Sequence, residues 1–167
     1  MQYISEKQEK IELIQKHFTK LLGCEITGYE LPQLWCEEDQ EWSDWMDLPL
    51  YLTIGGSTLS ISWKKFDELL IETGRVLPFS ITGFPVRWLA EDVQLLEPLI
   101  GQKLKSVSLA SDEMTLGGHQ IEIWTRLILT MDNDQNLVIY NALDENGLDH
   151  FKGPVPSGAV ICSQELW

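Results

Sequence analysis

Apolar residues near the start of the chain recur at the spacing of an α-helix. Six of them fall on one helical face: Ile4, Ile11, Ile14, Phe18, Leu21 and Leu22. Ser5 and Gln8 have the spacing of a capping box, in which the hydroxyl accepts a hydrogen bond from a first-turn amide. Gly23 fits a C-terminal cap, because glycine adopts the left-handed conformation at little cost. The sequence therefore predicts an amphipathic helix that begins after Ser5 and ends at Gly23.

Alternation of apolar and polar residues, which is typical of strands with one buried face, dominates much of the remaining chain. The expected strands are residues 24–31, 50–54, 58–63, 104–109, 120–131, 137–143 and 159–162. Gly55-Gly56 accepts the positive φ of a tight hairpin turn, and residues 132–134 (Asp-Asn-Asp) supply a second turn. Residues 32–48 and 110–118 are predicted to be loops, with Pro32 ending the first strand.

The remaining segments predict the overall fold class. Residues 89–100 predict a second short helix that is interrupted near Pro98 and stopped by Gly101. Residues 64–73 fit either a short helix or a strand. Residues 74–85 contain two prolines and two glycines and form the expected junction between two halves. The predicted class is therefore α+β: an antiparallel sheet with helices on one face.

The order of these elements repeats along the chain. Segments match at offsets of 77 or 78 residues: 21–23 with 99–101, 50–53 with 127–130, and 67–68 with 144–145. Hairpins and helix ends can resemble one another without duplication, but the constant offset favours a genuine repeat. We expect a single domain, residues 1–167, built from two helix–strand–hairpin pseudo-repeats at about residues 5–82 and 86–163.

Composition narrows the class of protein. A chain of 167 residues with 44% hydrophobic residues can bury a core without disulfides or metals. Its net charge of −14 opposes binding to nucleic-acid phosphates and to anionic membrane surfaces. The first ten residues lack an apolar signal core, and no apolar run is long enough to span a membrane. Three cysteines without a C-x-x-C pair indicate reduced thiols in a cytoplasmic protein.

The acidic residues are concentrated in one segment. No Lys or Arg occurs between Lys20 and Lys64. This span holds the candidate partner-binding residues, which are Trp35, Glu37, Glu38, Asp39, Glu41, Trp42, Asp44, Trp45 and Asp47. An exposed Trp can anchor an interface, and carboxylates beside it attract a basic partner. The alternative is a solvated acidic surface whose Trp rings fold back onto the sheet.

The chain carries no motif that predicts catalysis or cofactor binding. Residues 55–58 (Gly-Gly-Ser-Thr) lack the lysine of a phosphate-binding loop, and the three histidines lack metal-ligand spacing. Residues 132–136 resemble the start of a calcium loop but are not followed by the required Gly and Glu. The pairs Asp67-Glu68 and Asp144-Glu145 place neighbouring carboxylates on opposite strand faces and suit turns. We therefore predict no catalytic residue, no metal site and no cofactor.

One segment of the second repeat carries a resemblance. Residues 99–107 (Leu-Ile-Gly-Gln-x-Leu-x-Ser-Val) precede a hairpin of the form Leu-x-Leu, residues 127–129, and Leu-x-Ile, residues 137–139. This arrangement resembles uncharacterised bacterial α+β families of small acidic proteins, some of which are immunity proteins that neutralise toxins. The resemblance covers about half of the second repeat. It implies an α+β fold and identifies no functional residue.

The leading hypothesis is a non-catalytic binding protein, with an immunity-like role as one form. It would present the acidic, Trp-bearing loop to a basic protein partner, without binding nucleic acid or membranes. One alternative is a small-molecule binding protein or enzyme with a pocket between the two halves. The other is a structural module that self-associates through an edge strand.

Overall fold

Eleven strands and one α-helix form the described part of the chain, residues 2–79 and 82–165, in the computed structural model. The strands of the first sheet are β1 (Ile26–Cys36), β2 (Glu41–Asp44), β3 (Leu50–Ile54), β4 (Ser57–Lys64), β5 (Glu68–Thr73) and β6 (Val86–Leu89). Those of the second are β7 (Leu104–Leu116), β8 (His119–Met131), β9 (Gln135–Asn141), β10 (Asn146–Lys152) and β11 (Val160–Gln164). The helix α1 (Lys7–Phe18) continues as a 3-10 turn, Thr19–Leu21.

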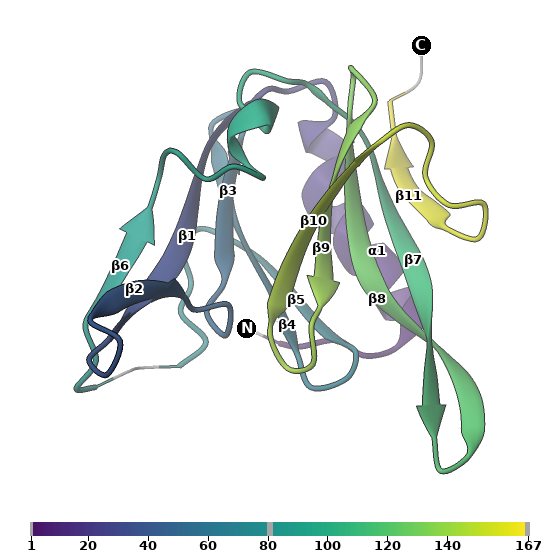
Figure 1. Ribbon diagram of the computed structural model, residues 1–167. Coiled ribbons are helices and arrows are strands. Elements are labelled where there is room, and N and C mark those ends of the chain that lie inside the picture. Colours follow the sequence, from purple (N-terminus) through teal and green to yellow (C-terminus); the bar gives the residue numbers. More distant parts are fainter. Residues whose placement is uncertain (1, 80–81, 166–167) are drawn as a thin grey trace.

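Two antiparallel sheets, shown side by side in Figure 1, replace the predicted single sheet. The first has the order β2-β1-β3-β4-β5, with β6 also paired to β1, and the second has the order β10-β9-β8-β7-β11. The predicted α+β class, with helices covering one face of a sheet, is wrong. The chain is mostly β because residues 32–48 and 110–118, which were expected to be loops, contain strands that pair with β2 and β8.

The predicted second helix is wrong for a local reason. Residues 86–89 pair with β1 as β6, and only the 3-10 turn Glu97–Leu99 is helical within residues 89–100. Asp92 has a left-handed backbone, with φ +61°, and Pro98 has no amide hydrogen to continue a helix. The helical spacing of Leu96 and Leu99 reflects their burial in the core and not a regular helix.

Other sequence predictions are confirmed at the level of elements. β3 and β4 form the predicted hairpin around Gly55-Gly56, and β8 and β9 are joined at Asp132–Asp134. β11 is the predicted edge strand. The ambiguous residues 64–73 contain a turn and then β5, and are not helical. The expected junction, residues 74–85, connects β5 to β6, although Ser80 and Ile81 lie outside the described residues.

The first helix packs against both sheets. It lies next to β5 of the first sheet and to β7 and β11 of the second. The capping residue is Glu6, whose carboxylate accepts a hydrogen bond from the Glu9 amide, one position later than predicted. Ile14, Phe18 and Leu21 are buried as expected, but Lys10 is also fully buried. Among the described residues, no helix has the length and apolar character to cross a bilayer.

The strand pairings of the two sheets correspond at the offset seen in the sequence. Tyr29 pairs with Leu52 in the first sheet, and Val107 pairs with Leu129 in the second. The pairing of β3 with β4 and of β8 with β9 corresponds in the same way, as does that of β4 with β5 and of β9 with β10. A register shift also follows the first pair of both β1–β3 and β7–β8. These equivalent registers support the proposal of a duplicated unit.

The two halves meet through matched backbone hydrogen bonds. Ile26 N donates to Gln102 O over 2.9 Å, and the equivalent Leu104 N donates to Cys24 O over 2.9 Å. Gly101 N donates to Ile26 O, and Gly23 N donates to Leu104 O, both over 2.8 Å. Both glycines have positive φ, +80° at Gly23 and +85° at Gly101. The join between the halves is therefore main-chain to main-chain, with local two-fold pseudo-symmetry.

One apolar core lies between the sheets. It contains side chains of α1, of β1, β3, β4 and β5, and of β7, β8 and β9. Trp63 is fully buried there, and its indole nitrogen donates to Ile139 O over 2.8 Å. Asn146 bonds two backbone groups of β4, Ile61 O and Trp63 N. The two sheets are thus fixed together by packing and by buried hydrogen bonds.

Candidate interaction surface

The predicted acidic loop is an ordered β-hairpin. β1 pairs with β3 through residues 26–30, then continues past the end of β3 to pair with β6 on one side and β2 on the other. Pro32 does not end the strand, because its lack of an amide hydrogen is tolerated near a sheet edge. Its carbonyl instead accepts a hydrogen bond from Trp45 N over 2.9 Å. We call residues 33–47 the acidic hairpin.

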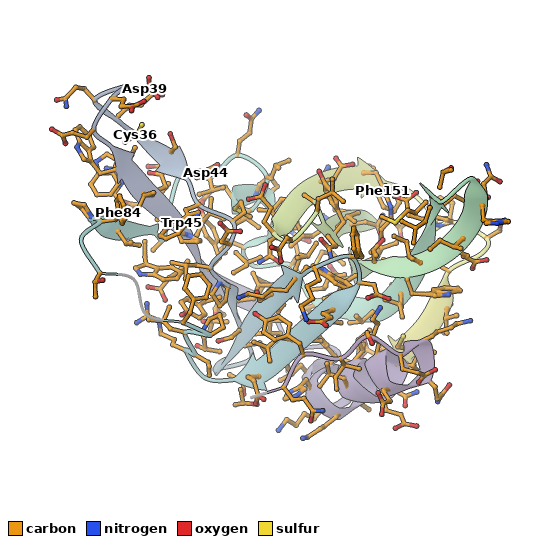
Figure 2. All side chains as sticks on the ribbon, turned by 90° about the horizontal axis from the view of Figure 1, so that it is seen from below. Cys36, Asp39, Asp44, Trp45, Phe84 and Phe151 are labelled. Carbon is orange, nitrogen blue, oxygen red and sulfur yellow. The ribbon has the colours of Figure 1, made fainter. Side chains whose placement is uncertain are left out.

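The tip of the acidic hairpin presents carboxylates to solvent. Glu37, Glu38 and Asp39 are exposed in the turn between β1 and β2. The turn is held by Gln40, which has φ +53° and donates from its side chain to Glu37 O over 2.8 Å. Figure 2 shows Cys36 and Asp39 at the far end of this projection. The tip is therefore a hydrogen-bonded turn that brings three exposed carboxylates together.

The three Trp rings of the acidic hairpin are partly buried and oriented. Trp35 and Trp42 are cross-strand partners, with ring centroids 5.5 Å apart in an edge-on arrangement. Trp45 packs edge-on against Phe79, at 6.4 Å between centroids. The indole nitrogens of Trp35 and Trp45 donate to carboxylates two residues away, those of Glu37 and Asp47. The rings are neither fully exposed anchors nor core, and their hydrogen bonds orient them beside the acids.

The charge of the acidic hairpin is not neutralised within the molecule. Among the described residues, no ion pair joins a Lys or Arg to the carboxylates of Glu37, Glu38, Asp39, Glu41, Asp44 or Asp47. The Arg87 guanidinium, on β6, lies 4.5 Å from the Trp42 ring and donates to Gln33 Oε1 over 2.9 Å. The carboxylates therefore keep an outward electrostatic field that favours a cationic partner.

An apolar patch adjoins the acidic hairpin. Phe84 and Leu77 are more than half exposed, at 61% and 54%. With Phe79 and Trp88 they line a shallow cavity of about 210 Å³. These residues were not predicted, because they lie in or just after the predicted junction and apart from the acidic segment in the sequence. Pairing of β6 with β1 brings Trp88 toward the hairpin, and Phe79 packs against Trp45.

The paired carboxylates singled out in the sequence have structural partners. Asp144 Oδ1 accepts a hydrogen bond from Lys65 N over 2.6 Å, and Glu68 pairs with Lys65 Nζ over 3.2 Å. Burial, followed by repulsion from Asp47 and Asp144, raises the pKa of Glu145 above its ordinary value. The hydrogen bond from Lys65 N to Asp144 joins the turn after β4 to the turn after β9. Among the described residues, no three His, Cys, Asp or Glu side chains form a metal-binding group.

One of the cavities between the halves, where a pocket was expected, is small and mostly apolar. A cavity of about 320 Å³ lies where the turn after β4 meets the turn after β9, lined by Lys65, Phe66, Leu143 and Asp144. The Asp144 carboxylate already accepts from the Lys65 backbone amide, and the Lys65 ammonium pairs with Glu68.

A polar contact elsewhere joins the Tyr29 hydroxyl to Glu97 Oε2, to which it donates over 2.5 Å, and burial raises the Tyr29 pKa to about 12. Tyr29 also accepts from Val93 N, so this contact fixes a loop.

Comparison with known proteins assigns no function to this chain. No protein-family model, curated protein or solved structure matches this chain. The resemblance to immunity-like families and the assignment of the nine hairpin residues to partner binding therefore stay predictions. What the structure adds is their geometry: a single hairpin carries all nine.

Proposed function

We propose that this chain is a non-catalytic binding protein that uses the acidic hairpin to bind a basic protein partner. The observation that carries the proposal is the combination of uncompensated carboxylates with three oriented Trp rings on one projecting hairpin. Carboxylates accelerate encounter with a basic surface, whereas aromatic contacts slow dissociation. An immunity-like role, in which the partner is a basic toxin, is one form of this function.

The adjoining apolar patch strengthens the proposal. Phe84 and Leu77 lie beside Trp45 and Phe79, so a partner would meet an apolar centre next to a charged rim. This is the usual anatomy of a protein interface, in which central aromatic contacts contribute most affinity and the rim sets specificity. In the apolar cavity lined by Lys65, Phe66, Leu143 and Asp144, both charged residues already have partners within the protein. Few polar groups there remain for recognising a small molecule.

Charge reversal on the hairpin tests this function. The variant Glu37→Lys, Glu38→Lys, Asp39→Lys changes the net charge from −14 to −8, a difference of 3 × 2. A matched control reverses three exposed acids elsewhere, Glu12, Glu25 and Glu91. Wild-type protein and both variants are immobilised and exposed to the soluble proteins of the source organism. Bound proteins are identified by mass spectrometry and then purified for kinetic measurement.

The expected result is a basic protein that binds the wild type and the control but not the hairpin variant. With the purified partner, the remaining binding to the hairpin variant should associate at least about tenfold more slowly at low salt, and the difference should shrink at high salt. Equal capture by the wild type and the hairpin variant would show that this surface does not bind the partner. An equal loss of binding in both variants would show that binding depends on net charge and not on the hairpin.

A further inference from the structure

The second sheet carries a projecting arm, whose first strand lies in the predicted loop 110–118 and whose second strand lies in the predicted strand 120–131. β11 pairs with β7 only through residues 106–109, and β9 pairs with β8 only through residues 126–130. Beyond a register shift at Ala110/Ser111, β7 and β8 continue alone to the turn at Gly117-Gly118. Figure 1 shows this two-stranded ribbon extending below the sheet. We call residues 111–124 the arm.

The two faces of the arm differ in chemistry. On one face, Met114 pairs with Ile121, beside Ile123 and Leu116. Leu116 is 57% exposed and Ile121 is 39% exposed. On the other face, Glu113 pairs directly with Glu122, and both are exposed. Neighbouring side chains along a strand alternate between faces, so the first face is mainly apolar, with Asp112 and His119 at its two ends. The second face is mainly polar and acidic, with Trp124 at the base of the arm.

These features lower the stability of the arm in the absence of a binding partner. A two-stranded ribbon is marginally stable by itself in water, and like charges directly opposite each other destabilise it further. Asp112 pairs with Arg126 over 3.2 Å, but within the described residues no base pairs with Glu113 or Glu122. A partner that covers the apolar face and supplies positive charge to the other face would relieve both costs.

The outer edges of the arm are free to accept another strand. Among the described strands, none pairs with the outside of residues 111–116 or 119–123. Exposed edges of this kind bind extended peptides through main-chain hydrogen bonds, with side chains alternating between the two faces. A strand added here would place every second residue beside Met114 or Ile121, and the others beside Glu113 or Glu122.

We propose that the arm is a second binding site, which takes an extended segment of a partner protein with alternating apolar and basic residues. The arm lies on the opposite side of the molecule from the acidic hairpin in Figure 1, and the proposal does not depend on binding at the hairpin. Charge complementarity selects the occupant. A second copy of this chain would bring another arm with the same acidic face and a net charge of −14, which opposes its approach.

A synthetic peptide tests the proposal without knowledge of the natural partner. The probe is a capped heptapeptide that alternates Lys and Val. One comparison peptide replaces Lys with Glu, and another replaces Val with Ser. Each is titrated into ¹⁵N-labelled protein, and amide chemical shifts are followed residue by residue. We expect saturable shifts in residues 111–124 with the Lys–Val peptide, and at least about tenfold weaker binding of either comparison peptide.

Variants of the arm separate specific docking from general charge attraction. Ile121→Ser removes apolar contact, and Glu113→Gln with Glu122→Gln removes the acidic pair. Each change should weaken binding of the Lys–Val peptide at least about fivefold. The control Leu143→Ser, which changes a 69% exposed apolar residue outside the arm, should leave the affinity unchanged. Thermal unfolding of each variant checks that the fold is intact.

The outcomes also distinguish this site from the proposed function. Shifts confined to residues 33–47 would overturn the arm site and leave the acidic hairpin as the binding surface. Shifts confined to the arm would support the arm site even if the hairpin bound no partner. Equal binding of all three peptides would overturn the proposal. Light scattering that showed a dimer of free protein, lost in Ile121→Ser, would assign the arm to a second copy and overturn it as well.

Discussion

Lys10 is the most unusual single residue of the core. Its side chain is fully buried, and its ammonium donates to Trp124 O over 2.8 Å and lies 5.5 Å from the Trp63 ring. Burial lowers the Lys10 pKa from 10.5 to about 8, against the opposing attraction of Asp67 and Glu6. Lys10 is buried where α1 packs against both sheets, whereas Lys7 and Lys16 of the same helix are exposed.

We expect Lys10 to make stability rise with pH. Between about pH 8 and pH 10.5 the unfolded chain keeps the proton that the folded chain has lost, so the folded state gains free energy as pH rises. The gain by pH 10 should be about 2 kcal/mol relative to Lys10→Met. Urea unfolding of both proteins at pH 7, 8, 9 and 10 measures the difference. An unchanged difference across this range would show that Lys10 titrates normally.

Tyrosine and cysteine ionisation make the Lys10→Met comparison necessary. Burial raises the pKa of Tyr29 to about 12 and that of Cys162 to about 11. For such groups the unfolded chain loses its proton first, so stability falls as pH passes the ordinary values of 9 to 10. Because these residues are the same in both proteins, their contributions cancel in the difference.

At the scale of elements, β10 is joined to β4 by one side chain. Asn146 is 1% exposed; it accepts from Trp63 N over 2.8 Å and donates to Ile61 O over 3.0 Å. We expect Asn146→Ala to lower the free energy of unfolding by about 2–4 kcal/mol, because two buried backbone groups lose their partners. The exposed turn substitution Asn133→Ala is the control and should cost less than about 1 kcal/mol. Urea titration followed by Trp fluorescence measures both.

The elements that the sequence predicted well are those with strong local patterns. Alternation located β3, β4, β8 and β9, and the spacing of Ile14 and Phe18 located α1. The errors fall where a distant partner decides the structure. Residues 86–89 form a strand because β1 pairs with them from more than 50 positions away. Residues 111–116 look like a polar loop, yet they continue β7 because β8 returns directly beside them.

The same distinction applies to the candidate surfaces. Composition was enough to identify the acidic and Trp residues of the acidic hairpin, since they lie close together in the sequence. It could not identify Arg87, which reaches the hairpin on β6, or Phe84 and Leu77 in the connection that precedes β6. It also missed the arm, whose two faces exist only once Met114 is paired with Ile121 and Glu113 with Glu122.

At the scale of the whole molecule, excess negative charge opposes compactness. The net charge is −14, and the acidic hairpin concentrates part of it without internal ion pairs. We expect 0.5 M NaCl to raise the melting temperature of the wild type by about 2–5 °C through screening of this repulsion. The hairpin variant with three lysines should gain less, because its repulsion is already reduced. Calorimetry of both proteins at low and high NaCl measures the two changes in melting temperature. An equal rise in both would show that the repulsion arises outside the acidic hairpin.

The main-chain join between the halves has a consequence for how such a protein can change over evolutionary time. Its matched hydrogen bonds, from Ile26 to Gln102 and from Leu104 to Cys24, use no side-chain atoms. Mutations on either half can therefore accumulate without breaking the join, provided that Gly23 and Gly101 keep their left-handed backbone. After a duplication, each copy could acquire its own projecting hairpin. One now carries indoles and carboxylates, and the other an aliphatic ridge.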